Sequence, residues 1–293
     1  MNRADVKLGF IGVGAAKAGT SWLAACWAEH PGLCMAEPKE LNYFCTKAIW
    51  PGFRVNRALG SDWLAERFAH RQSGQILGEF SPNYFCDPQS PGLIFDHNPQ
   101  CRLIFSLRHP VDAVVSYYHQ VRKEVPVADT LEGFLDDNPE VCEMGKYHRH
   151  ARAFLAVFPR KQCQFLFFED IQRKAAAVLE KSYSFIGVAE DFFPRNVDQR
   201  VNELKEPRSK RLLVAVDSIR RLVQSGSGGA RAQRWLWKLQ VYRLHEWIMQ
   251  RNLRSFSPPP ISQSTRRQLL DLYRDDTRAL AGLLERDLSH WEH

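Results

Sequence analysis

Short apolar runs alternate with amphipathic stretches along the first two-thirds of the chain. Each run has the length of a strand buried on both faces, and the stretches between them repeat apolar residues at helical spacing. Strands that alternate with helices predict a parallel sheet covered by helices on both faces. We expect strands at residues 6–12, 75–79, 102–107 and 163–168, and helices at residues 20–29, 61–70, 111–123, 143–158 and 171–186.

The pattern changes after about residue 195. No strand is expected beyond it, and loops rich in glycine and proline separate three charged amphipathic helices. The fold class is therefore α/β, with a C-terminal helical extension on the same core. We expect one domain over residues 1–293, with an α/β core at 1–195 and the extension at 196–293. The three helices are expected at residues 208–224, 234–253 and 263–288.

The helix expected at 234–253 is rich in aromatic and basic residues. One interpretation is that Leu236, Leu239 and Trp247 pack on the core, and this is the favoured one. The other is a helix that binds an acceptor or lies on a membrane surface.

The first expected strand leads into a glycine-rich turn, GVGAAKAGTSWL, at residues 12–23. Gly14 and Gly19 keep the spacing of a Walker A loop, G-x-x-x-x-G-K-[ST], but Thr20 occupies the lysine position and Lys17 precedes Gly19 by two residues. Small residues let backbone N–H groups approach an anion, and the positive end of the following helix points to the same place. The turn therefore predicts an anion site.

Side chains of the turn extend this prediction to a nucleotide. Lys17 adds a charge, Thr20 and Ser21 add hydroxyl donors, and Trp22 offers an aromatic face for a base. We also expect Thr20 or Ser21 to cap the helix that begins here.

A second phosphate element lies in RLIFSLRHPVDAVVSYYH, residues 102–119. Arg108 ends a strand, and Ser116 lies two helical turns further on. The two can converge on one phosphate, the arginine as a bidentate donor and the serine as a hydroxyl donor.

Together these two segments resemble the sulfotransferases that use 3'-phosphoadenosine 5'-phosphosulfate (PAPS). KAGTSWL is similar to their 5'-phosphosulfate loop, K-x-G-[TS]-[TS]-x-L, and the strand-R-x-P-x-x-x-x-x-S arrangement is similar to their 3'-phosphate element. The resemblance implies a P-loop-like sheet and a PAPS site. The residues it assigns to PAPS in these segments are Lys17, Ala18, Gly19, Thr20, Ser21, Trp22, Arg108 and Ser116.

The segment MAEPKELNYF, residues 35–44, resembles the E-x-x-[FY]-F segment of the glycosaminoglycan-type sulfotransferases. The resemblance makes Glu40 the general base that takes the acceptor proton, with Lys17 stabilising charge on the donor. Glu37 does not match this spacing, and a solvated loop charge is the alternative for Glu40.

The segment GEFSPNYF, residues 78–85, is similar to the family's next active-site segment. By this resemblance Glu79 and Ser81 contact the acceptor. Phe80 stands where some glycosaminoglycan enzymes carry a lysine, which argues against a sulfated or uronate-rich acceptor. His119 is a further candidate for the acceptor side, although a structural role is favoured for it.

Later segments resemble the family more weakly. Tyr147, in a G-x-Y helix, is a candidate contact of the nucleotide. The polar, basic loop NELKEPRSKRL at 202–212 lies where family members close over the adenosine and the 3'-phosphate. Its candidates are Arg208, Ser209 and Lys210.

Composition limits the partners. The net charge of +7 favours anionic ligands, and the seven cysteines are scattered without a C-x-x-C pair, so no metal site is expected. No apolar stretch approaches the roughly 18 residues of a membrane span, and no signal peptide precedes the first strand. We therefore expect a cytoplasmic protein without a nucleic-acid partner; its oligomeric state is left open by the sequence.

The resemblance implies transfer of the sulfuryl group of PAPS to an acceptor hydroxyl, which leaves adenosine 3',5'-bisphosphate. The sequence leaves the acceptor open among a sugar, a lipid and a small metabolite, because the acceptor is chosen by variable loops that carry no motif. Two alternatives remain, a P-loop kinase or NTPase and a non-catalytic nucleotide-binding protein. The Walker lysine is missing, which disfavours the first.

Overall fold

A computed structural model of the chain describes residues 6–46, 55–195, 197, 205–209, 211–212, 214, 247, 251–255 and 261–293. Its centre is a five-stranded sheet in the order β2-β3-β1-β4-β5, in which every pair of neighbouring strands is parallel. The strands are β1 Phe10–Gly14, β2 Leu33–Met35, β3 Ile76–Phe80, β4 Arg102–Leu107 and β5 Cys163–Phe167.

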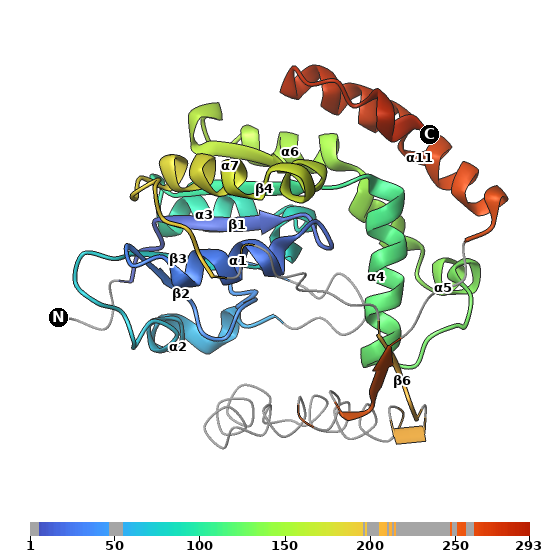
Figure 1. Cartoon of the computed structure of the whole chain (residues 1–293), viewed down its shortest axis with the longest axis horizontal. Helices are drawn as coiled ribbons and strands as arrows, with labels where there is room; N and C mark the ends of the chain where they lie inside the picture. The colour runs from blue at the N-terminus through green and yellow to red at the C-terminus, as the bar shows by residue number, and fades with distance from the viewer. Residues whose placement is uncertain are drawn as a thin grey trace.

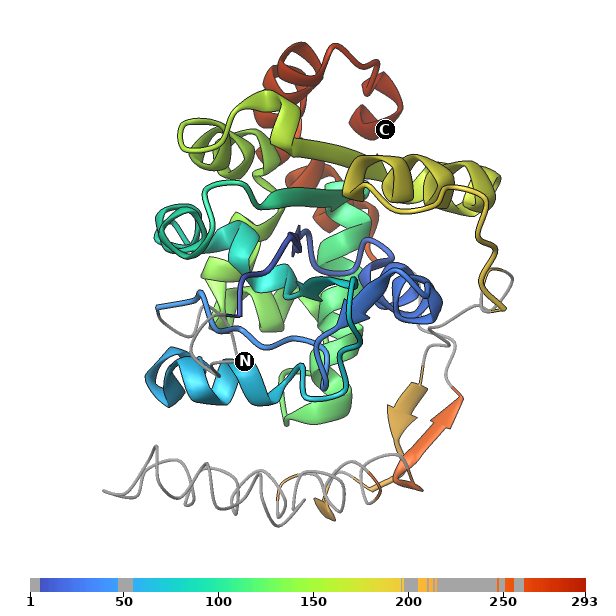
Figure 2. The same cartoon turned by 90° about the vertical axis from the view of Figure 1, so that its left-hand side faces the viewer.

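Helices cover both faces of this sheet (Figures 1 and 2). Successive strand residues point to opposite faces, so Phe10 packs with Trp27 in one core cluster and Ile11 belongs to another. The helices are α1 Thr20–Glu29, α2 Gly60–Glu66, α3 Ser90–His97, α4 Pro110–Glu124, α5 Leu131–Asp137, α6 Tyr147–Leu155, α7 Phe168–Ile186 and α11 Gln263–Leu284. Short 3-10 helices lie at Arg57–Leu59, Pro82–Cys86, Pro139–Gly145, Arg160–Gln162 and Ser289–Glu292.

The parallel α/β sheet and the C-terminal helix agree with the prediction from the sequence. All four expected strands are present, although the first begins at Phe10 rather than at residue 6. The sequence pattern missed β2, a strand of three residues, because so short a run carries no period. It also missed α3 and α5.

The expectation that no strand follows residue 195 was wrong. Lys205–Pro207 (β6) and Leu253–Ser255 (β7) pair antiparallel, and β6 packs against α4 (Figure 1). Two short strands far apart in sequence become a ladder only through tertiary contact, which local periodicity does not report. Most of the helices expected at 208–224 and 234–253 lie outside the described residues.

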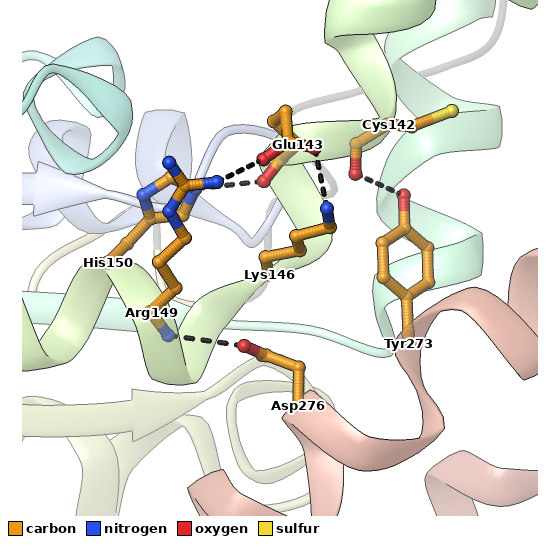
Figure 3. Close-up of polar contacts among 7 residues, drawn as sticks. All are labelled: Cys142, Glu143, Lys146, Arg149, His150, Tyr273 and Asp276. Carbon is orange, nitrogen blue, oxygen red and sulfur yellow. Dashed lines mark hydrogen bonds and ion pairs between the residues drawn. The ribbon is translucent and has the colours of Figure 1, made fainter.

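The last long helix, α11, is joined to the core by polar contacts at the start of α6 (Figure 3). Asp276 accepts hydrogen bonds from the backbone N–H groups of His148 at 2.8 Å and Arg149 at 3.1 Å. A carboxylate is favourable there, because the first N–H groups of a helix have no intrahelical acceptor. The Tyr273 hydroxyl donates to the Cys142 carbonyl at 2.8 Å, so α11 also fixes the segment before α6.

Glu143 ties that segment to α6 from the other side (Figure 3). Its carboxylate lies 2.6 Å from the ammonium of Lys146 and 2.6 Å from the guanidinium of Arg149. Its backbone carbonyl lies 2.8 Å from the ring nitrogen Nε2 of His150. These contacts set the position of Tyr147, the first residue of α6.

We expect Gly145→Ala to lower the free energy of unfolding by about 1–3 kcal/mol, measured by urea titration. A Cβ at Gly145 would lie 2.5 Å from the ring of Tyr273, and the hydroxyl of that ring is held by Cys142. Gly282→Ala, also on α11, is the matched control, because nothing lies within 4 Å of its Cβ. It should instead raise stability, by about 0.5–1 kcal/mol. Equal effects of the two changes would contradict this account.

Candidate active site

The candidate residues gather at the carboxyl edge of the sheet around β1. β1 lies between β3 and β4. After β1 the chain forms β2 and β3 on one side of this strand and then β4 and β5 on the other side. This is the point at which the strand order reverses, where open α/β sheets bind ligands. In Figure 1 the arrow of β1 points toward α4, which stands beside this edge.

The loop after β1 is held by the neighbouring strand β4. The N–H of Ala15 donates to the carbonyl of Ser106 at 2.7 Å, and the hydroxyl of Ser106 donates to the carbonyl of Ala18. Arg108 donates through Nη1 to the carbonyl of Lys17 at 3.2 Å. Two consecutive carbonyls of the loop are thereby bound by Ser106 of β4 and by Arg108, the residue after β4, so the loop and Arg108 form one unit.

The prediction that Thr20 or Ser21 caps α1 was wrong. Gly19 is the N-cap residue, with a left-handed φ of 81°, and no side chain caps this helix. Thr20 is already the first helical residue. The glycine lets the chain turn sharply into the helix, and the N–H groups of the first turn have no intrahelical acceptor. The helix start therefore keeps donors for an anion.

Lys17 is the charged residue of this loop, in a left-handed conformation with φ of 65°. Burial lowers the pKa of its ammonium to about 8, and the nearby ammonium of Lys123 acts in the same direction. Glu40 and Glu124 act in the opposite direction. A buried ammonium close to a second one is stabilised by an anion bound beside it.

Glu40 lies in the loop that follows β2, with its side chain 44% exposed and 2.6 Å from the ammonium of Lys39. Its φ is 66°, and that of Asn42 is 48°, so two non-glycine residues of this loop adopt the left-handed conformation. Such residues persist only where surrounding contacts hold them.

Those contacts come from the segment after β3 and from Asn56. The hydroxyl of Ser81 accepts the N–H of Asn42 at 2.9 Å, and the hydroxyl of Tyr84 accepts the N–H of Tyr43 at 2.9 Å. Asn83 donates to the Asn42 side chain at 3.1 Å. On the other side, the Asn56 side chain donates to the Leu41 carbonyl at 2.8 Å.

Glu79 and Ser81, the expected acceptor contacts, lie underneath the Glu40 loop rather than at its surface. They are 1% and 0% exposed, and the hydroxyl of Ser81 donates to Glu79 Oε2 at 2.7 Å. Burial raises the pKa of the Glu79 carboxyl to about 7, although hydrogen bonds, including the one from Ser81, act in the opposite direction.

The remaining candidates of the core are Arg108, Ser116 and His119. The guanidinium of Arg108 lies over the ring of Phe168, 4.7 Å from its centroid. Ser116 is half-buried on α4, and His119, one turn later, is buried. Burial lowers the pKa of His119, with Arg122 acting in the same direction.

Two aromatic candidates are mostly enclosed. Tyr147 is 1% exposed, and its pKa is raised, chiefly by burial, with Arg108 acting against this. The indole N–H of Trp22 donates to the carbonyl of Val197 at 3.2 Å, and its side chain is buried. A contact of either ring with a nucleotide stays a prediction.

The candidates of the 202–212 loop are described only in part. The N–H of Arg208 donates to the backbone carbonyl of Asn252 at 2.5 Å, and the N–H of Ser209 donates to the side-chain oxygen Oδ1 of Asn252 at 2.9 Å. These contacts continue the β6–β7 pair, which lies at the lower end of α4 in Figure 1. Lys210 lies outside the described residues.

The sequence analysis missed the residues that hold the two loops. Ser106 stood out as a lone hydroxyl in the apolar run RLIFSL, and a serine buried in a central strand needs a partner. Asn42 and Tyr84 gave no comparable indication, because their role depends on contacts between segments about forty residues apart.

The described part of the chain has neither a metal-binding cluster nor a membrane-spanning helix. No group of three or more histidine, cysteine, aspartate or glutamate side chains there could hold a metal ion. No helix among those residues has the length and apolar content needed to span a membrane.

The chain matches a protein family and is similar to known proteins. Residues 10–212 match the family model described as a sulfotransferase domain. The heparan sulfate glucosamine 3-O-sulfotransferase 3B1 of Mus musculus is 26% identical over 187 residues, which cover 60% of this chain and 45% of that protein. The membrane-associated sulfotransferase kil1 of Dictyostelium discoideum is 26% identical over 156 residues, which cover 50% and 31%. The chain thus spans less than half the length of these two relatives.

Solved structures show the same fold. The sulfotransferase from Alicyclobacillus acidocaldarius aligns with a TM-score of 0.69 at 21% identity, over 98% of this chain and 100% of that one. The sulfotransferase domain from the curacin biosynthetic pathway aligns with a TM-score of 0.51 at 14% identity, over 97% and 99%.

We expect Lys17→Met to stabilise the protein at pH 7, by up to about 3 kcal/mol in the free energy of unfolding. The folded pKa of Lys17, about 8, lies below the ordinary value of 10.5, so the charged form costs stability below pH 8. That cost disappears as pH rises toward 10.5. The difference in free energy of unfolding between Lys17→Met and the wild type should disappear with it. Urea titrations at pH 7 and pH 10 measure it, and a difference that does not shrink would refute the assigned pKa.

Proposed function

This chain belongs to the sulfotransferase domain family, and from that premise we propose that it moves the sulfuryl group of PAPS to an acceptor hydroxyl. The observation that carries the proposal is the junction of β1 and β4. There the loop with Lys17 and the side chain of Arg108 form one unit beside an uncapped helix start.

The residues at this junction suit a donor with phosphate at both ends. Lys17, Thr20 and Ser21, with the first N–H groups of α1, would bind the 5'-phosphosulfate. Arg108 and Ser116 would bind the 3'-phosphate, the group that distinguishes PAPS from ATP. The lowered pKa of Lys17 supports this assignment, because a bound anion would offset the cost of the buried charge.

In the proposed reaction the acceptor oxygen attacks sulfur in line with the bridging oxygen of the 5'-phosphate. The new sulfur–oxygen bond forms as the old one breaks, and the acceptor proton passes to Glu40. The products are a sulfate ester and adenosine 3',5'-bisphosphate. Lys17 would stabilise the charge that develops on the leaving phosphate, so the protein acts mainly by positioning and electrostatics.

Glu40 is the proposed base because of its place and its exposure. Its carboxylate is close enough to Lys17 to raise the pKa of that ammonium, and its side chain is 44% exposed, so an acceptor can reach it. The left-handed backbone and the contacts of its loop hold it in one position.

The acceptor is proposed only as a hydroxyl of a sugar, a lipid or a small metabolite. The printed name of the mouse relative places its own activity on heparan sulfate glucosamine. We propose a sugar hydroxyl as the first class to screen, with labelled PAPS. The cytoplasmic location stays a prediction, and one relative is named as membrane-associated.

We expect Glu40→Gln to lower the transfer rate by at least about 100-fold, because the amide cannot accept the acceptor proton. Affinity for adenosine 3',5'-bisphosphate, measured by calorimetry, should stay within about twofold, since Glu40 does not hold the nucleotide. Glu37→Gln is the matched control, an exposed carboxylate of the same segment, and it should keep the wild-type rate. Full activity in Glu40→Gln would remove Glu40 as the base.

We expect Arg108→Met to weaken binding of adenosine 3',5'-bisphosphate by about 10- to 100-fold and binding of adenosine 5'-monophosphate much less. Arg108 also holds the carbonyl of Lys17, so part of any loss could come from the loop. Ser106→Ala separates the two effects, because it loosens the same loop and leaves the charge. Ser106→Ala should weaken binding of both nucleotides by the same factor. An equal loss for both nucleotides in Arg108→Met would contradict the 3'-phosphate role.

A further inference from the structure

A buried hydrogen-bonded chain runs from Glu79 at the end of β3 to the loop that carries Glu40. The Ser81 hydroxyl donates to Glu79 Oε2 at 2.7 Å and accepts the N–H of Asn42 at 2.9 Å. Glu79 and Ser81 are 1% and 0% exposed, so neither can touch an acceptor without a rearrangement of the loop above them.

The direction of these bonds depends on Glu79. A serine hydroxyl has one proton and rotates freely, whereas an ionised carboxylate, the form of Glu79 above its pKa of about 7, only accepts. With Glu79 accepting, the Ser81 proton points toward β3 and a lone pair of its oxygen is left for Asn42. Without that acceptor the buried Ser81 proton has no partner, and the hydroxyl would rotate toward another acceptor, which weakens its bond with the N–H of Asn42.

The loop needs this bond because its backbone is strained. Glu40 and Asn42 both have left-handed φ values, 66° and 48°. Such a conformation is unfavourable for a residue with a side chain unless neighbouring contacts compensate. Asn42 is held through its N–H by Ser81 and through its side chain by Asn83. Loss of the first contact leaves Glu40 free to relax from its position.

We propose that Glu79 and Ser81 are positioning residues for Glu40, which they hold in place through the backbone of Asn42. They act on the rate of transfer and bind neither the acceptor nor the nucleotide. The proposal rests on the function proposed above, in which Glu40 is the base.

The test compares Ser81→Ala with Ser106→Ala, two fully buried serines that each hold one loop of the site. Ser81→Ala should lower kcat by about 10- to 100-fold, because a small misplacement of a reacting group has effects of that size. Its affinity for adenosine 3',5'-bisphosphate should stay within about twofold. Ser106→Ala should instead weaken binding of the bisphosphate, because it loosens the loop that carries Lys17.

Hydrogen exchange gives a readout that does not depend on activity. In Ser81→Ala the amides of residues 40–44 should exchange faster and those of residues 15–19 should not change. Ser106→Ala should give the opposite pattern. If exchange follows this pattern but the unmodified protein transfers no sulfuryl group to any acceptor class, the proposed function fails while the hold on the loop stands.

Substitutions of Glu79 test the direction of the bonds and guard against a variant that does not fold. Glu79→Gln keeps an oxygen that accepts the Ser81 proton, so its kcat should stay within about fivefold of wild type. Glu79→Leu has no acceptor and should behave like Ser81→Ala. A Glu79→Gln enzyme as slow as Glu79→Leu would overturn the proposal. A Ser81→Ala enzyme with normal kcat would also overturn it. So would one in which only the KM for the acceptor rises while amide hydrogen exchange is unchanged.

Discussion

The hydrogen bonds from Ser106 and Arg108 to the carbonyls of Ala18 and Lys17 are the contacts on which the candidate site depends. Ser106 and Arg108 make them, and both residues belong to the strand next to β1 or to its immediate end. A loop of small residues has little side-chain packing of its own, so its shape must come from such neighbours. The same contacts put Arg108 beside the loop, which is why two segments about ninety residues apart in the sequence lie together in the candidate site.

The second loop of the site is built on the same principle. A buried serine at the end of a central strand, Ser81, holds the backbone of a loop that contains left-handed residues. Four non-glycine residues of the described chain have positive φ, and three of them, Lys17, Glu40 and Asn42, lie in these two loops. Such strain is typical of functional sites, because the fold around it must compensate its cost. The buried charge of Lys17 adds a second cost at the same place.

The sequence predicted the elements whose apolar residues recur at a regular spacing and missed those that depend on contacts between distant segments. Apolar runs and helical spacing were sufficient for the parallel sheet and for α1, α4, α7 and α11, because long buried elements carry a clear period. β2 and the β6–β7 pair are too short for that. The motifs predicted Lys17, Arg108 and Glu40 as site residues. They could not predict that Gly19 is the N-cap residue of α1 with no side chain capping the helix, or that Ser81 lies beneath a loop, because both follow from backbone conformation.

The absence of a lysine next to Glu79 has a different meaning once the structure is considered. Phe80 occupies that position, is fully buried and stacks on Trp27 with ring centroids 5.5 Å apart. The ammonium of Lys39 lies 5.7 Å from the centroid of the Phe80 ring and 2.6 Å from Glu40. A positive charge is therefore present beside the proposed base, supplied by the loop after β2 rather than by β3. Phe80 alone thus gives no reason to exclude an anionic acceptor.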